Sequence, residues 1–226
     1  MHPAIAIAKA TMLDPLHLIQ PTIGSITIMA FTFFFRDLPV LEYAVDQAIK
    51  LAMGRMRIKV WDAGSALGQE PYTLAILFAE RLGATFNNLY LDATDYDSEN
   101  NFGDIVKLAT YKYEELQRIP VDIFTKYFDS QGNDLYRVCE KVRSRVFFQY
   151  HDLLSLRPIG SDYALVVCKN VLLHFNYSER IEVIKMYHQA LSAGGYLAME
   201  NTQKMPTEIS HLFEQVVPDA QLYKKL

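Results

Sequence analysis

The chain has 226 residues, half of them hydrophobic and 21% charged, with a formal net charge of −4. This length suits one large domain with an appendage or two small domains, at about 150 residues per domain, and the apolar content excludes a mainly disordered chain. The slight acid excess argues against a nucleic-acid binder held by phosphate contacts. Two cysteines, Cys139 and Cys168, are too few for a disulfide framework or a four-cysteine zinc site. We therefore expect a reducing, cytoplasmic setting and no metal.

The N-terminal segment contains a nearly unbroken apolar run from Thr22 to Phe35. A membrane helix needs about 20 such residues, and this run is shorter and ends at the charged pair Arg36-Asp37. The start of the chain has neither the basic region nor the cleavage site of a signal peptide. We expect buried or partner-facing sequence here rather than membrane insertion.

Helix and strand patterns alternate along the rest of the chain. Hydrophobic periodicity predicts helices at 39–53, 70–82, 98–108 and 178–191, and strands at 57–61, 88–93, 163–168, 195–199 and 221–226. Strand patterns at 135–138 and 146–148 flank a short charged segment and predict a small β excursion. This alternation predicts an α/β fold with a doubly wound, mostly parallel sheet, and ligands bind such sheets at the carboxyl ends of the strands.

A glycine-containing turn, Gly64 to Gly68, follows the first predicted strand. Glycine lets the backbone approach a ligand closely. Glu70 and Pro71 open the next helix and put a carboxylate and a missing N–H where a phosphate would need amide donors. The following strand ends in Asp95, which is placed to accept hydrogen bonds from ribose hydroxyls. A phosphate-free nucleoside with a cationic tail fits this pattern, and S-adenosylmethionine is such a molecule.

From about residue 30 to the end, the chain resembles the CheR-type chemoreceptor glutamate methyltransferases. The resemblance rests on the following motifs: Thr32–Asp37, Lys59–Thr73, Ala93–Asp97, Leu116–Pro120, Lys126–Phe128, Asp152–Leu154, Cys168–Phe175 and Ala193–Leu197. It implies a Rossmann-like class I methyltransferase domain over 37–226, with a small inserted antiparallel β subdomain at about 130–150. Residues 1–36 would then be a remnant or truncated form of the family's N-terminal helical domain.

The resemblance also implies site residues and reactants. S-adenosylmethionine would be the methyl donor, S-adenosylhomocysteine the product, and a protein, such as the cytoplasmic helices of a chemoreceptor, the acceptor. Arg36 matches the family's catalytic arginine, and His174 lies at the place that faces the reacting methyl. The expected cofactor-binding residues are Thr32, Arg36, Glu70, Asp95, Asp152, Leu153, Cys168 and Lys169, together with Gly64 of the turn.

Several positions depart from the family pattern. Asp152 stands where the family has Asn, Lys169 where it has Arg, and His174 where it has Tyr, and the basic N-terminal domain that helps to dock on receptor helices is absent or reduced. Cofactor binding tolerates these changes, whereas receptor recognition does not follow from the sequence. Two alternatives therefore stay open: a cofactor-binding regulatory module without catalysis, and a methyltransferase with another acceptor. At the residue level, Arg36 could instead form a surface ion pair with Asp37 or Glu42.

Overall fold

The computed structural model describes residues 32–96 and 101–226. Thr32–Leu226 forms one compact unit. Most of the predicted N-terminal segment, including the apolar run up to Phe31, lies outside the described residues, as does the first part of the helix predicted at 98–108.

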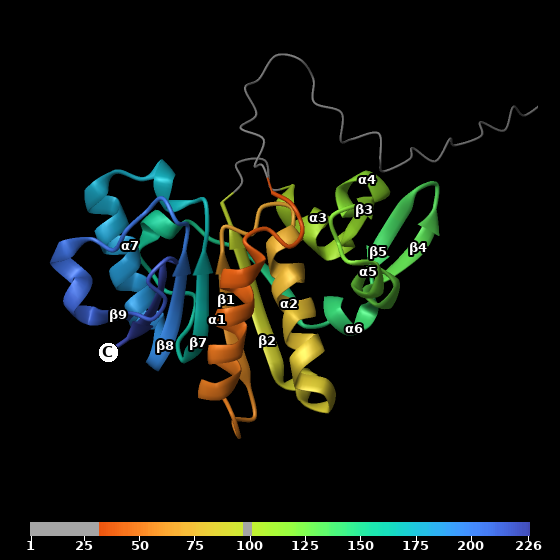
Figure 1. The fold of residues 1–226 in the computed structure, drawn as a ribbon. Helices are drawn as coiled ribbons and strands as arrows, with labels where there is room; N and C mark the ends of the chain where they lie inside the picture. The colour runs from red at the N-terminus through yellow and green to blue at the C-terminus, as the bar shows by residue number, and fades with distance from the viewer. Residues whose placement is uncertain (1–31, 97–100) are drawn as a thin grey trace, which may run out of the picture. The chain divides into compact units, whose positions relative to one another are not determined.

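A seven-stranded sheet forms the centre of this unit, in the order β6-β2-β1-β7-β8-β10-β9 (Figure 1). Its strands are β1 (Ile58–Ala63), β2 (Leu89–Asp95), β6 (Val146–Tyr150), β7 (Tyr163–Cys168), β8 (Leu191–Met199), β9 (Phe213–Gln215) and β10 (Leu222–Lys225). The pairs among β6, β2, β1, β7 and β8 are parallel, while β10 runs antiparallel to both β8 and β9. The carboxyl ends of β1, β2 and β7 therefore meet at one edge of the sheet.

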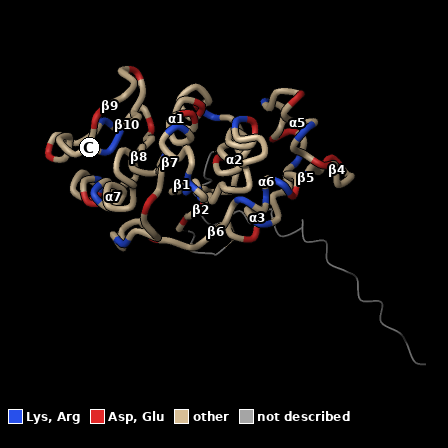
Figure 2. Tube along the Cα trace, turned by 90° about the horizontal axis from the view of Figure 1, so that it is seen from below, with Lys and Arg blue, Asp and Glu red and all other residues tan. Residues whose placement is uncertain are grey.

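Helices cover both faces of this sheet. Helices α1 (Leu38–Leu51) and α2 (Gln69–Leu82) lie side by side over one face, and α7 (Tyr177–Ala190) lies on the other (Figures 1 and 2). The buried stripe of α1, which includes Leu41, Val45 and Ala48, has the helical spacing that places apolar side chains on one face. Two hydrophobic cores result, one on each side of the sheet.

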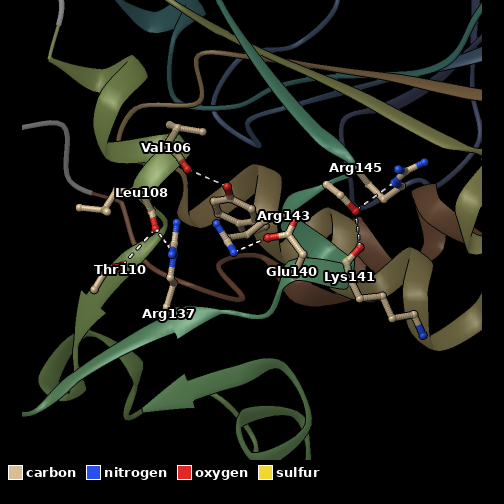
Figure 3. A network of polar contacts seen from close by, with 10 residues as sticks. Val106, Leu108, Thr110, Arg137, Glu140, Lys141, Arg143 and Arg145 are labelled. Atoms are coloured by element: carbon tan, nitrogen blue, oxygen red, sulfur yellow. Dashed lines mark hydrogen bonds and ion pairs between the residues drawn. The ribbon is translucent and has the colours of Figure 1, made fainter. Parts of the chain in front are cut away.

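A second, three-stranded antiparallel sheet lies beside the large one, in the order β3-β5-β4. It consists of β3 (Thr110–Lys112), β4 (Phe128–Gly132) and β5 (Leu135–Val138), with the short helices α3 (Phe102–Leu108), α4 (Tyr113–Leu116), α5 (Val121–Tyr127) and α6 (Glu140–Arg143) around it. Arg137 of β5 donates to the Leu108 carbonyl (3.0 Å), and Tyr72 of α2 donates to the Val106 carbonyl (2.6 Å) (Figure 3). These bonds tie α3 to both the small sheet and the main helical layer.

The structure confirms the predicted fold class, an α/β fold with a mostly parallel sheet and a small antiparallel one. The interpretation of the strand at 146–148 was wrong: it belongs to the large sheet as β6, parallel to β2, and the small sheet instead recruits Thr110–Lys112 and Phe128–Gly132. The short strand β9 was not predicted. A local pattern identifies a strand but does not name its partner, because pairing joins residues far apart in sequence.

Acidic and basic residues of both signs are distributed along the described elements (Figure 2). Within the ranges that the structure describes, no helix has both the length and the apolar character needed to cross a bilayer.

Candidate functional site

The turn after β1 lies at the carboxyl edge of the large sheet. Gly64 and Gly68 have φ values of 106° and 97°, in the left-handed region that favours glycine. The amides of Gly64 and Ser65 both donate to the Thr94 carbonyl, at 2.8 and 3.0 Å, which fixes the turn against the end of β2. A Cβ added to Gly64 would lie 2.2 Å from Cγ2 of Val171, so the backbone here passes too close to the loop after β7 for any side chain.

Asp95 ends β2 directly beside this turn. The Ala66 amide donates to its Oδ2 (2.6 Å) and the Tyr96 amide donates to its Oδ1 (2.7 Å). These backbone bonds hold the Asp95 carboxylate at the carboxyl end of β2, beside the turn. That it binds ribose hydroxyls stays a prediction.

Two further carboxyl groups lie under the turn. Asp62, near the end of β1, is completely buried, and Glu70 stands in the first turn of α2. Burial, together with the neighbouring Glu70 and Asp95, raises the pKa of Asp62 well above its usual range. Burial also raises the pKa of Glu70 to about 7, against the opposing effects of the Asp62 hydrogen bond and of Lys169. Two carboxyl groups in such contact do not both ionise readily, because like charges repel each other.

Two contacts join the segment before α1 to the loop after β7. Arg36 donates from Nη2 to Oδ1 of Asn170 at 2.9 Å. Lys169 Nζ, whose side chain is fully buried, forms an ion pair with Oδ2 of Asp37 at 2.7 Å. Asp37 and Asn170 have φ values of 52° and 61°, so two tight turns face each other through these contacts. Arg36 is thereby held at the same edge as Glu70.

The other predicted residues are spread along this edge. The Asp152 side chain accepts from the Leu154 amide (2.8 Å) and begins a short 3₁₀ helix that contains the buried Leu153. Cys168 ends β7, fully buried; burial raises the pKa of its thiol, and Tyr187 donates to its Sγ at 3.2 Å.

Two predicted residues are less enclosed. His174 is exposed at the end of the 3₁₀ helix Leu172–His174, and Thr32 is partly buried at the start of the described chain.

Of the predicted site residues, Arg36 and Lys169 both interact electrostatically with Glu70, and Asp95 lies beside the turn that carries Gly64. Their assigned roles stay predictions.

Sequence reasoning missed three residues of this region. Asp62 was read only as part of the turn, although an acid at the end of a buried, otherwise apolar strand is a signal that could have been followed. Asn170 was not recognised as the acceptor for Arg36. Glu200 is buried after β8 and accepts from the Leu173 amide at 3.1 Å, which braces the loop that carries His174. Sequence alone gives no signal for that long-range contact.

A hollow with a volume of about 380 Å³ lies among Met205, Phe213, Gln215 and Tyr223. None of the predicted site residues lines it. In the described ranges there is no group of three His, Cys, Asp or Glu side chains placed to hold a metal ion.

The family "CheR methyltransferase, SAM binding domain" matches residues 30–221. The chain therefore belongs to this family, and the predicted resemblance to CheR-type methyltransferases is confirmed at the level of the family domain. S-adenosylmethionine is the cofactor that the family binds.

Three relatives illustrate the range of similarity. A "Chemotaxis protein methyltransferase 1" from Pseudomonas aeruginosa is 29% identical over 74% of this chain and 63% of its own length. A "Probable chemotaxis protein methyltransferase" from Rhizobium etli is 22% identical over 82% and 72%. An "Uncharacterized 104.1 kDa protein in hypE 3'region" from Rhodobacter capsulatus is 29% identical over 79% of this chain but only 19% of its own. The chain thus spans from about a fifth to less than three quarters of these relatives.

Among solved structures, a TehB-like SAM-dependent methyltransferase from Corynebacterium glutamicum is 14% identical, with a TM-score of 0.47, over 82% of this chain and 85% of its own.

The residues of the turn fit this cofactor. The amides of Gly64 and Ser65 donate to the Thr94 carbonyl and that of Ala66 donates to Asp95, so they are already bonded within the chain. Apart from the carboxyl of Glu70, no donor of the described chain pairs with the two buried oxygens of Asp62. Acidic groups beside a turn whose amides are already bonded suit a ligand with an ammonium and a sulfonium group better than one with phosphates.

Proposed function

We propose that this chain transfers the methyl group of S-adenosylmethionine to a carboxylate side chain of a protein and releases S-adenosylhomocysteine. Glutamates on the cytoplasmic helices of a chemoreceptor are the candidate acceptors, and the cytoplasm is the proposed location. The observation that carries the proposal is the Arg36 guanidinium, held by Asn170 beside an acid-lined glycine turn. The chemotaxis methyltransferase relatives support the choice of acceptor.

The proposed methyl transfer requires no proton transfer by the protein. The cofactor supplies an activated methyl group on a sulfonium. A glutamate acceptor is already ionised above a pH of about 4.3, and the leaving group is a neutral thioether, so neither a general base nor a general acid is needed. The protein must align the acceptor and exclude water, and positioning alone can contribute about 7–11 kcal/mol.

The residues divide this work between binding and alignment. Asp95 is assigned to the ribose hydroxyls, and Glu70 to the cationic tail of the cofactor. Arg36 is assigned to the acceptor, because its planar fork can hold a carboxylate in one orientation. Asn170 holds that fork from one side through the bond from Nη2 and so limits the orientations that the guanidinium can take.

Titration calorimetry followed by a transfer assay tests this proposal. We expect S-adenosylmethionine to bind more tightly than NAD, and Asp95→Ala to weaken that binding by about 1.5–3 kcal/mol, roughly ten- to a hundredfold. Asp95→Asn is the matched control, because it keeps one carbonyl oxygen for the backbone donors and should lose less affinity. Tighter binding of NAD would refute the proposal.

Transfer of a tritiated methyl group to membranes that contain chemoreceptors separates the alternatives. A base-labile product is expected, because a methyl ester hydrolyses in alkali. A base-stable product would identify another class of acceptor. Cofactor binding without transfer to any protein would instead identify a regulatory module that has lost catalysis.

A further inference from the structure

Asp62 is a completely buried acid. It has no exposed surface, and apart from the carboxyl of Glu70 no N–H or O–H group of the described chain pairs with its oxygens. An ionised carboxylate in that position would be costly, because burial removes its water and no charge or dipole replaces it. The group that it does contact is the carboxyl of Glu70, and two carboxyl groups can hydrogen bond only when one of them holds a proton.

Charged groups from every neighbouring element face this pair. Asp95 approaches Asp62 from β2, and Lys169, Arg36 and Asp37 approach Glu70 from the two loops above the sheet. Asp62 and Glu200 also act electrostatically on Cys168 of β7 and Tyr187 of α7.

The nearby cations act on Glu70: Lys169 and Arg36 favour its ionised form, although burial still outweighs them. Lys169 is bound to Asp37 at 2.7 Å, and Arg36 donates to Asn170. Burial, Glu70 and Asp95 act on Asp62, and all of them raise its pKa. A positive charge beside Asp62 would therefore relieve the cost of ionising it.

We propose that Asp62 and Glu70 form a proton-exchanging site for an ammonium group: the two carboxyls share one proton in the ligand-free protein and release it to solvent when the α-ammonium of the bound ligand takes its place. This inference rests on the proposed function, because that function supplies a ligand with such a group. No covalent bond changes. The shared proton leaves for water, and the N–H groups of the ammonium donate to the two carboxylates that remain.

A cation is the natural replacement for that proton. Placed between two carboxyls, a positive charge lowers the pKa values of both, so the pair ionises fully while it is bound. The same electrostatics explains why a phosphate or a second carboxylate would not enter. The site thus selects the amino end of the ligand by charge.

Calorimetry in two buffers tests the exchange. The full chain is titrated with S-adenosylhomocysteine at pH 7 in phosphate and in Tris, whose ionisation enthalpies differ strongly. We expect the binding enthalpies in the two buffers to differ by the amount that corresponds to release of about one proton. 5′-Methylthioadenosine, which lacks the amino-acid tail, is the matched ligand and should bind with equal enthalpy in both buffers.

Variants identify the source of the proton. Asp62→Asn should bind S-adenosylhomocysteine without release, whereas Glu200→Gln, which alters another buried acid of the same region, should keep the release. Binding without any buffer dependence in the wild-type chain would overturn the exchange while leaving the proposed function intact. No binding of either ligand would overturn the proposed function itself. Equal release with both ligands would also contradict the inference, even if Asp62→Asn failed to fold.

Discussion

Arg36 and Asp37 are neighbours in sequence, yet they contact different residues of one loop. Arg36 donates to Asn170, and Asp37 forms an ion pair with Lys169. Because Lys169 is buried, this pair is well placed to keep the start of α1 in register with the end of β7. Lys169, which stands where the family has Arg, therefore has an ion-pair partner of its own in this chain, Asp37.

Arg36→Ala should separate binding from transfer. We expect S-adenosylhomocysteine to bind within a few-fold of wild type while methyl transfer falls by at least about a hundredfold, because a misaligned acceptor loses the benefit of positioning. Calorimetry and the tritiated-methyl assay measure the two effects. Asn170→Ala is the companion variant: it keeps the guanidinium and removes only its bond to Asn170, so transfer should fall by less. If Arg36→Ala kept most of its turnover, the arginine would have only a structural role.

The sequence predicted the acids and the arginine of the site better than their surroundings. Glu70 and Asp95 could be predicted because each follows a strand or opens a helix at the binding edge of a parallel sheet. Asp62 could not be predicted as a site residue in the same way. What sets it apart is its complete burial, and burial depends on how the whole molecule packs. The partnership of Arg36 with Asn170 joins residues more than a hundred positions apart.

At the scale of elements, the carboxyl edge depends on how closely the turn after β1 approaches the loop after β7. Gly64 makes this approach possible, both by its positive φ and by the space that its missing side chain leaves to Val171. Periodicity predicted most helix and strand positions, but it did not predict which strands pair. For example, β6 pairs with β2, although the strands of the small sheet lie between them in the sequence.

Gly64→Ala should destabilise the fold by about 2–4 kcal/mol, through backbone strain and a forced contact with Val171. Urea unfolding followed by circular dichroism measures this change. The double variant with Val171→Ala should be less destabilised than the sum of the two single variants, because removing Cγ2 relieves the contact but not the φ strain. Strict additivity would show that the two residues do not collide.

On the scale of the whole molecule, the net charge of −4 is small, but the buried charged residues are not evenly distributed between acids and bases. Asp62 and Glu200 are buried acids, and Lys169 is the buried base among the described residues. The family's cofactor has an ammonium and a sulfonium against one carboxylate and therefore carries one net positive charge, opposite in sign to the acids of this edge.

The ligand-free chain should lose stability as the pH rises through neutrality. Burial raises the folded-state pKa values of Asp62 and of Glu70, the latter to about 7. The folded state therefore binds more protons than the unfolded chain above the ordinary carboxyl pKa, and that contribution to stability disappears as the pH passes the raised values. Each extra proton held by the folded state corresponds to a slope of up to about 1.4 kcal/mol per pH unit.

Other groups also titrate in this range, so a difference between two proteins gives the clearest measurement. Burial lowers the pKa values of His151 and His188, which makes their contribution rise with pH up to the ordinary imidazole range and then level off. These histidines are the same in wild type and in Asp62→Asn and cancel in the comparison. From pH 6.5 to 8, urea unfolding should show wild type falling relative to Asp62→Asn, with the variant the more stable at pH 8, because its neutral amide never has to ionise beside Glu70. Parallel stability curves for the two proteins would mean that the Asp62 carboxyl holds no proton in the folded chain near neutral pH.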